Sequence, residues 1–229
     1  ITDNNEKVSS MFDKAVLAIK NISENYSANV AYYDNDLLSN LKKNRDVINA
    51  FNNALANKHL KMYLQPQVRC SDEKVVGAEA LVRWETENGA IHSPNSFIKI
   101  LEDNGLIHNL DKFIWEQAVQ LLQKWQFLGI DYHISVNVSA KDFYLIDLYK
   151  TFTSLVIKYG IPPQKLKLEI TETALVHDLK LHKQIITELQ KFGFIIEMDD
   201  FGTGYSSLTI LKNISINILK IDMMFLSKT

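Results

Sequence analysis

Cysteine is almost absent from this sequence, and it has neither a long apolar run nor a large excess of one charge. Cys70 is the only cysteine in 229 residues, so no disulfide can form within the chain, and this usage fits a reducing compartment. No apolar run approaches the length of a membrane span, and no signal peptide is recognisable. We therefore expect a cytoplasmic protein, although segments outside this sequence could still anchor its parent to a membrane.

The charge balance argues against another class of function. The 25 Lys and Arg residues and 27 Asp and Glu residues give a net charge of −2, which does not supply the basic surface that duplex nucleic acid requires. A small anionic ligand stays compatible with this balance, because bound metal ions can supply the positive charge. The composition, 46% hydrophobic and 23% charged, is that of a globular chain with a sizeable core.

The first 57 residues differ from the rest of the chain in their pattern of predicted helices and strands. An apolar pattern of helical period runs from residue 2 to about 25, and residues 29–34 could form a short strand. Asp34 can cap a second helix that carries its own apolar pattern. Two helices and one strand are too few for an independent domain, so we expect the tail of a preceding domain and a linker helix. Because the sequence begins with Ile1, we also expect a fragment of a longer protein.

From Leu60 onward, strand-like and helix-like segments alternate, which predicts βα units and a parallel sheet. The predicted strands cover residues 60–68, 75–84, 133–139, 166–171, 194–199 and 218–222. The predicted helices cover about 94–103, 110–128, 141–159, 178–192 and 204–212. The fold class is therefore α/β.

Polar side chains interrupt these strands near their carboxyl ends, where a parallel sheet should stay apolar. Asp199 and Asp200 follow one strand directly, and two neighbouring carboxylates repel each other unless a cation lies nearby. The same feature recurs on four other strands, at Glu79, Asn137, Glu169, and Lys220 with Asp222. A single buried polar residue is usually satisfied by a neighbour and means little. In a closed barrel, however, all these strand ends meet at one face.

The set of oxygen donors indicates a hard divalent cation. Mg²⁺ or Mn²⁺ prefers such ligands, Ca²⁺ is a candidate inhibitory substitute, and zinc is disfavoured because it prefers His and Cys. More carboxylates than one ion needs suggests two ions, an arrangement suited to in-line displacement at phosphorus. Lys220 has two open interpretations: a structural ion pair with Glu169 or Asp222, or orientation of an attacking water and stabilisation of developing charge.

Eight motifs in order give the chain a close resemblance to the EAL domain, a family of cyclic di-GMP phosphodiesterases with a TIM-like barrel. They are YLQPQV (63–68), EALVRW (79–84), SPNSFI (93–98), LDKFIWEQA (110–118), SVNVSA (135–140), LEITET (168–173), DDFGTGYSSL (199–208) and LKID (219–222). The resemblance covers residues 58–229 and implies hydrolysis of cyclic di-GMP to linear pGpG.

The resemblance also implies roles for individual residues. Two divalent metals would be held by Glu79, Asn137, Glu169, Asp199 and Asp200. Lys220 would help to hold the nucleophilic water, and Glu172 would anchor the loop after Asp200, so these two join Glu79 and Asp200 as candidate catalytic residues. Candidate substrate contacts are Gln65 on the guanine side, Arg83 on phosphate, and Asp222. Relatives often dimerise beside the loop after Asp200, so we expect a homodimer.

Both ends of the chain depart from a complete EAL domain. The family has two further barrel strands after LKID, the first with a glutamate that completes the metal site, whereas this sequence stops at Thr229. We therefore expect a C-terminally incomplete barrel. Residues 1–34 are similar to the end of a GGDEF domain, followed by a linker helix over 35–57 and the EAL domain over 58–229.

Three other interpretations remain open. The chain could be an inactive EAL module that binds cyclic di-GMP or docks a partner, and the missing glutamate keeps this alternative alive. It could be a barrel enzyme of other chemistry, such as a phosphate-binding isomerase or aldolase, which would favour a Gly-rich phosphate loop late in the barrel. The least specific alternative is a purely structural half-domain.

Overall fold

The computed structural model describes residues 7–22, 30, 32–33, 35–86, 88–176, 178–202 and 207–223. The chain divides into two compact units, Ile1–Asn53 and Ala54–Thr229. None of the described helices is long and apolar enough to cross a membrane.

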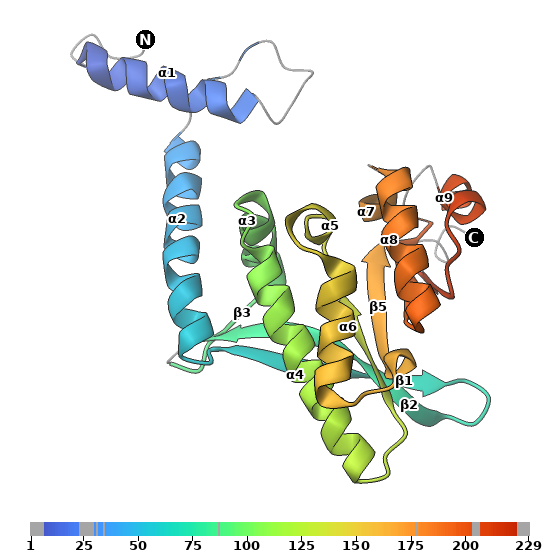
Figure 1. Cartoon of the computed structure of the whole chain (residues 1–229). Coiled ribbons are helices and arrows are strands. Elements are labelled where there is room, and N and C mark those ends of the chain that lie inside the picture. The colour runs from blue at the N-terminus through green and yellow to red at the C-terminus, as the bar shows by residue number, and fades with distance from the viewer. Residues whose placement is uncertain are drawn as a thin grey trace. The chain divides into compact units, whose positions relative to one another are not determined.

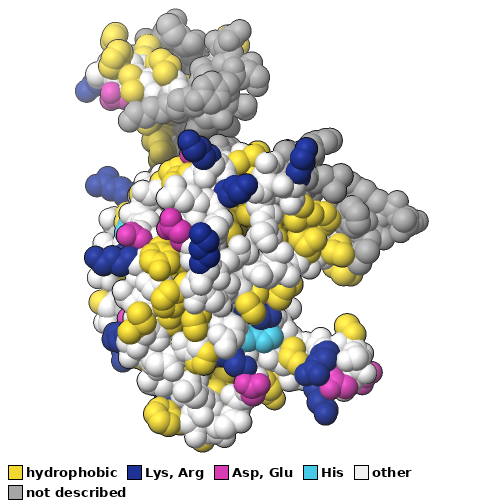
Figure 2. All heavy atoms as spheres, turned by 45° about the vertical axis from the view of Figure 1, so that its right-hand side comes forward, with side chains coloured by type: hydrophobic (Ala, Val, Ile, Leu, Met, Phe, Trp, Pro, Cys, Tyr) yellow, Lys and Arg dark blue, Asp and Glu magenta, His cyan; other side chains and the backbone are white. Residues whose placement is uncertain are grey.

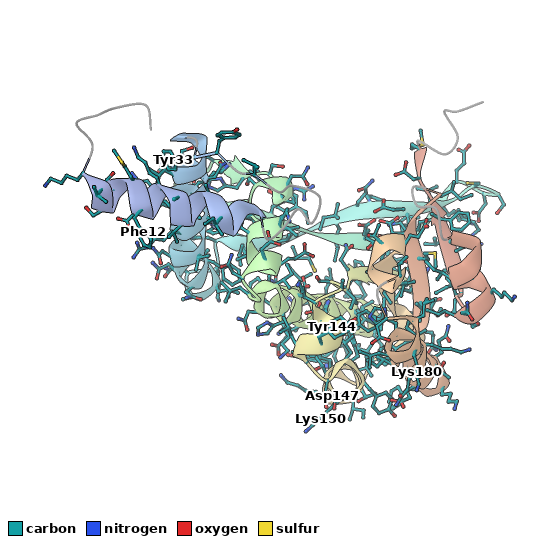
Figure 3. All side chains as sticks on the ribbon, turned by 90° about the horizontal axis from the view of Figure 1, so that it is seen from above. Phe12, Tyr33, Tyr144, Asp147, Lys150 and Lys180 are labelled. Atoms are coloured by element: carbon teal, nitrogen blue, oxygen red, sulfur yellow. The ribbon has the colours of Figure 1, made fainter. Side chains whose placement is uncertain are left out.

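The first unit contains helix α1 (Val8–Ile22) and most of helix α2 (Asn35–Ala56), where the sequence predicted two helices. The Lys14 ammonium lies 5.1 Å from the ring centre of Tyr33, which Figure 3 labels. Of the strand predicted over 29–34, half lies outside the described residues. That prediction is wrong for the described half (Val30, Tyr32 and Tyr33), which has no regular secondary structure.

The second unit is built on one sheet, and all six predicted strands are present. They are β1 (Leu60–Arg69), β2 (Lys74–Glu85), β4 (His133–Asn137), β5 (Leu166–Thr171), β6 (Ile195–Phe201) and β7 (Ile218–Ile221). The order is β1-β2-β4-β5-β6-β7, and the short β3 (Ile91–His92) pairs with β2. From β2 through β7 the neighbours on this path are parallel.

The first strand departs from the predicted parallel sheet, because β1 pairs with β2 in the antiparallel sense. Only residues 70–73 connect the two strands, and a parallel crossover needs about a dozen residues or more. Among the described residues, β1 and β7 form the two edges of the sheet. The architecture is that of an incomplete TIM-like barrel, as the sequence predicted.

Helices cover one face of this sheet. Helices α4 (Ile107–Phe127), α6 (Leu148–Tyr159) and α8 (Leu179–Phe192) lie side by side along it (Figure 1). The shorter helices are η1 (Pro94–Ser96), α3 (Ile98–Asp103), α5 (Asp142–Leu145), η2 (Pro163–Lys165), α7 (Glu172–Val176) and α9 (Ser207–Asn213). The predicted helix over 141–159 is interrupted at Ile146, and Asp147 caps α6 by accepting from the Lys150 backbone N–H at 2.9 Å (Figure 3).

The two faces of the central strands differ in chemistry. Ile134, Val136, Leu168 and Ile196 are fully buried on the face toward the helices, or nearly so. The alternate residues face what would be the barrel interior, because successive side chains of a strand point to opposite faces. These alternate residues are largely polar, and they include Asn137, Glu169, Asp199 and Lys220. The alternation therefore places the candidate site residues on a single face.

Candidate functional site

Lys220 lies at the centre of the candidate site. Its ammonium donates to Glu79 Oε2 at 2.9 Å and to Glu169 Oε1, and it lies 3.4 Å from Asp199 Oδ1. These four residues come from β7, β2, β5 and β6. The convergence of strand ends that the sequence predicted is thus present for these residues, and the ion pair between Lys220 and Glu169 also exists.

Strand register brings two more predicted residues beside this cluster. Gln65 lies directly opposite Glu79 in the antiparallel pair, and Asn137 pairs in register with Glu169. The Asn137 amide lies 3.5 Å from Glu79 Oε1, at the limit of a hydrogen bond. Residues that are partners across neighbouring strands share a face, so Gln65, Glu79 and Asn137 all face the same side.

Arg83 lies on the same strand as Glu79, four residues further on. Its guanidinium donates to its neighbour's carbonyl, Val82 O, at 2.7 Å and lies 5.8 Å from the ring centre of Tyr63. The Tyr63 hydroxyl in turn donates to Glu85 at 2.8 Å. A cavity of about 550 Å³ is lined by Glu79, Arg83 and Asn137 among others. The predicted phosphate contact therefore borders a space that a small ligand can enter.

Asp199 and Asp200 form an irregularity that the sequence did not predict. Met198 pairs with Leu219 and Phe201 with Ile221, so two aspartates on β6 stand opposite Lys220 alone on β7. Asp200 adopts a left-handed backbone with φ of 58°, which a residue other than glycine rarely takes and Asp tolerates better than most. This is a β-bulge, a device that redirects side chains next to functional sites.

The bulge gathers negative charge. The pKa of Asp200 is raised by its partial burial, with further contributions from the nearby Asp199 and Asp222, while Lys220 opposes the shift. Asp222, predicted to contact substrate, thus lies within electrostatic range of Asp200. Its backbone N–H also donates weakly to Phe201 O at 3.4 Å. The predicted substrate residue Asp222, directly after β7, and the predicted metal residue Asp200 on β6 are therefore neighbours.

Glu169 is the most perturbed member of the cluster. Its side chain has no exposed surface, and burial raises its pKa to about 8. The hydrogen bond and charge of Lys220 oppose this shift, while repulsion from Glu79 and hydrogen bonding with Asp199 add to it. Its Oε2 is buried without a hydrogen-bond partner among the described residues. Although burial lowers the pKa of Lys220, the bonds to Glu169 and Glu79 raise it above its usual value.

Glu172 begins α7, immediately after β5, and is almost fully buried. Its Oε2 accepts from the Gly202 backbone N–H at 3.0 Å, just after the Asp199–Asp200 bulge. This is the contact that loop anchoring requires. Residues 203–206 of the predicted loop lie outside the described residues.

Comparison with known proteins now adds the family. The model of the EAL domain matches residues 48–229. The chain belongs to the EAL domain family. Two curated relatives of this EAL chain cover most of its length. Signaling protein YkoW of Bacillus subtilis (strain 168) is 33% identical over 218 residues, which are 94% of this chain and 27% of YkoW. The bifunctional diguanylate cyclase/cyclic di-GMP phosphodiesterase MucR of Pseudomonas aeruginosa is 30% identical over 198 residues, 86% of this chain and 29% of MucR.

Solved structures of the family have the same fold. The PaMucR phosphodiesterase in complex with c-di-GMP has a TM-score of 0.75 and 32% identity, over 80% of this chain and 74% of that one. The EAL enzyme Bd1971 in its form bound to cAMP and cyclic di-GMP has a TM-score of 0.77 and 27% identity, over 98% of this chain and 59% of that one. This EAL chain spans between about a quarter and a third of the curated relatives' length.

Proposed function

We propose that this EAL chain is the catalytic part of a phosphodiesterase that hydrolyses cyclic di-GMP to linear pGpG. The observation that carries the proposal is the convergence of three carboxylates from separate strands on Lys220, beside a cavity bordered by Arg83. The relative MucR is named as a cyclic di-GMP phosphodiesterase, and PaMucR has been solved with c-di-GMP bound. Both support the same substrate.

The proposal includes two divalent cations, Mg²⁺ or Mn²⁺. The donor set fits them in type, because Glu79, Asn137, Glu169, Asp199 and Asp200 offer only oxygen ligands. It fits in charge as well, because four carboxylates exceed one ammonium and the Glu169 Oε2 has no described partner. Bound cations would polarise the phosphoryl group and lower the pKa of a bound water.

The chain's own residues would supply binding and orientation. Arg83 would hold a phosphate and Gln65 the guanine side, with Asp222 as a further substrate contact. Lys220 would orient the attacking water and stabilise charge developing on phosphorus. Water adds to phosphorus, the P–O3′ bond breaks, and the proton released ends on the leaving 3′ oxygen.

The direct test uses the purified full-length protein with Mn²⁺. It should convert cyclic di-GMP to pGpG, and Asp199→Asn should abolish conversion because it removes one carboxylate from the centre. Chromatography of the reaction products measures both. Normal turnover by Asp199→Asn would contradict the mechanism.

A second candidate is an inactive receptor for cyclic di-GMP or a docking module. One observation favours it: among the described residues no three Asp, Glu, His or Cys side chains are grouped to hold a metal, and the Lys220 ammonium lies between the acids. Calorimetry separates the two functions. Tight binding of the dinucleotide without metal, and with no product formed, would support the receptor.

We also propose that residues 1–34 are the end of a GGDEF-like domain. Val8, Phe12 and Ile19 of α1 are 80%, 68% and 65% exposed, which leaves an apolar stripe for a preceding domain to cover. MucR, named in part as a diguanylate cyclase, is more than three times as long as its match. A GGDEF motif upstream of Ile1 in the parent protein would support this proposal, and another kind of sequence there would contradict it.

A cytoplasmic homodimer completes the proposal. The single exposed cysteine, Cys70, suits a reducing compartment. The dimer would form beside the loop that follows Asp200, and light scattering of the full-length protein would measure its mass. A monomer at micromolar concentration would contradict it.

A further inference from the structure

The segment that follows β4 is held by hydrogen bonds on both sides of Asn137 and Ser139. The buried Trp115 indole N–H donates to Asn137 O at 2.9 Å. The Ser139 hydroxyl donates to Glu102 Oε1 at 2.8 Å, and its backbone N–H donates to Asp142 Oδ2 at 3.0 Å. Between them, the Val138 backbone N–H donates to Glu169 O at 2.9 Å. Residues 137–139 are thus held by hydrogen bonds from four elements, which are the helices α3, α4 and α5 and the strand β5.

The acids that take part are enclosed to different degrees: Asp142 is fully buried, whereas Glu102 and Asp111 are half-buried and border the same cavity as Asn137. The Oδ1 atom of Asp142 has no hydrogen-bond partner among the described residues, and the carboxyl of Asp111 lies close enough to Asp142 for each to shift the pKa of the other. Glu102 also lies within electrostatic range of both aspartates. Burying the carboxyl group of Asp142 with two further acids beside it costs free energy that apolar side chains of similar size avoid. This arrangement therefore requires a reason other than packing.

The position of the cluster suggests that reason. Asn137 is the last residue of β4, and its pair with Glu169 is the last pair between β4 and β5. The regular strand pairing therefore ends at the residue whose side chain would bind the cation. Beyond it, the hydrogen bonds of Val138 and Ser139 to described residues fix the direction of the chain. Mg²⁺ demands nearly ideal octahedral geometry at about 2.0–2.1 Å, so a small displacement of a ligand weakens binding. The neutral amide of Asn137 is attracted to a cation less strongly than a carboxylate is. Its contribution to cation binding therefore depends more on the exact position of its oxygen.

We propose that Glu102, Asp111, Trp115, Ser139 and Asp142 form a clamp that positions Asn137 for the divalent cation of the proposed activity. Members of this Ser139 clamp are positioning residues, because they act through the backbone of residues 137–139. The inference rests on the proposed metal-dependent function. It adds that affinity for the cation depends on side chains from α3 and α4 that do not belong to the cluster around Lys220.

The test measures Mn²⁺ binding to the full-length protein by calorimetry, without nucleotide. Ser139→Ala removes the hydroxyl that joins the loop to Glu102 and should raise the dissociation constant for Mn²⁺ about tenfold or more, as outer-sphere changes do at metal sites. Ser139→Thr keeps the hydroxyl and should restore most of the affinity. Ser154→Ala, at an exposed position of α6, is the matched control and should bind as the unaltered protein does.

A second variant tests the hydrogen bond from Trp115 to the backbone of Asn137. Trp115→Phe keeps an aromatic ring in the core, makes the side chain smaller and removes the N–H donor to Asn137 O, so it should also weaken Mn²⁺ binding. Circular dichroism at the working temperature confirms that each variant is folded. Folded Ser139→Ala and Trp115→Phe proteins with unchanged Mn²⁺ affinity would overturn the clamp while leaving the proposed function intact. Failure of the unaltered protein to bind Mn²⁺ would overturn both.

Discussion

A single lysine accounts for most of the electrostatic balance of the candidate site. Lys220 neutralises part of the charge on Glu79 and Asp199 and donates to the Glu169 carboxyl, and its own side chain is only 27% exposed. Exposed ion pairs contribute little to stability, but removing one partner of a buried pair leaves an uncompensated charge. In the metal-free protein, Lys220 is therefore expected to hold the carboxyl ends of four strands together.

Replacing this lysine tests that role. Lys220→Met keeps the length of the side chain and removes the charge, so the free energy of unfolding of the metal-free protein should fall by about 3 kcal/mol, near the lower end for a broken buried pair. Urea unfolding measures the change. Lys99→Met is the control, because the Lys99 pair with Asp103 is on the surface and its loss should cost less than about 0.5 kcal/mol. Equal effects of the two substitutions would contradict the role assigned to Lys220.

Asp111 gives a prediction for the dependence of stability on pH. Burial, and then repulsion from Asp142, raises the pKa of Asp111 well above its ordinary value, and Glu102 adds to the shift. The folded state therefore keeps a proton that the unfolded state releases near pH 4, so this group's contribution to stability falls as pH rises above about 4. Asp111→Asn still offers a donor to Asp142 and does not titrate.

The variant should consequently gain stability, relative to the unaltered protein, between pH 5 and pH 8. Urea unfolding at both values measures the difference. Asp142 and Glu102, which lie near Asp111, and His108, which acts on Asp142, are the same in both proteins. The same difference in stability at pH 5 and pH 8 would show that Asp111 is ionised in the folded protein.

At the scale of elements, the sequence predicted the strands better than their details. The positions of all six strands follow from apolar segments between turn signals, and the antiparallel sense of β1 could have been read from its short connection to β2. The bulge at Asp199 and Asp200 could not, because pairing register depends on β7, which lies about 20 residues away in sequence. The sequence also did not predict that β6 has polar side chains on its inner face. Glu197 is 3% exposed and pairs with Lys167 at 3.1 Å, although the segment reads as an apolar strand.

The connection after β6 depends on one contact that can be tested. Glu172→Ala removes the acceptor of the Gly202 N–H and should lower phosphodiesterase activity of the full-length protein about 10–100-fold, because the backbone next to Asp200 loses its support. Glu172→Gln keeps an oxygen acceptor and should lose much less activity. Initial rates at saturating Mn²⁺ measure both. An alanine variant as active as the glutamine variant would show that the contact has no role in catalysis.

At the scale of the whole molecule, the strand order determines which residues can meet. The sequence predicted the oxygen donors one strand at a time, and the parallel order β2-β4-β5-β6-β7 brings their carboxyl ends to one edge. The sequence left open an ion pair of Lys220 with Glu169 or Asp222. It did not reveal that Lys220 would contact Glu79, Glu169 and Asp199 together, since this depends on side chains from four strands. On the face shown in Figure 2, Lys and Arg side chains are scattered among apolar and acidic ones, so that face offers no continuous basic patch to attract an anionic ligand.

Metal removal should therefore affect stability as well as activity. The carboxylates gathered at the sheet edge repel one another, and a cation that binds only the folded state at 100 times its dissociation constant adds about 2.7 kcal/mol. For a folding unit of this chain's size, 229 residues, this corresponds to a rise of roughly 5–10 °C in the melting temperature of that unit's own transition within the full-length protein. Thermal unfolding of the full-length protein should show this rise with Mn²⁺ and its reversal with EDTA. Asp199→Asn should show a much smaller rise, and an equal rise in both proteins would place the bound cation elsewhere.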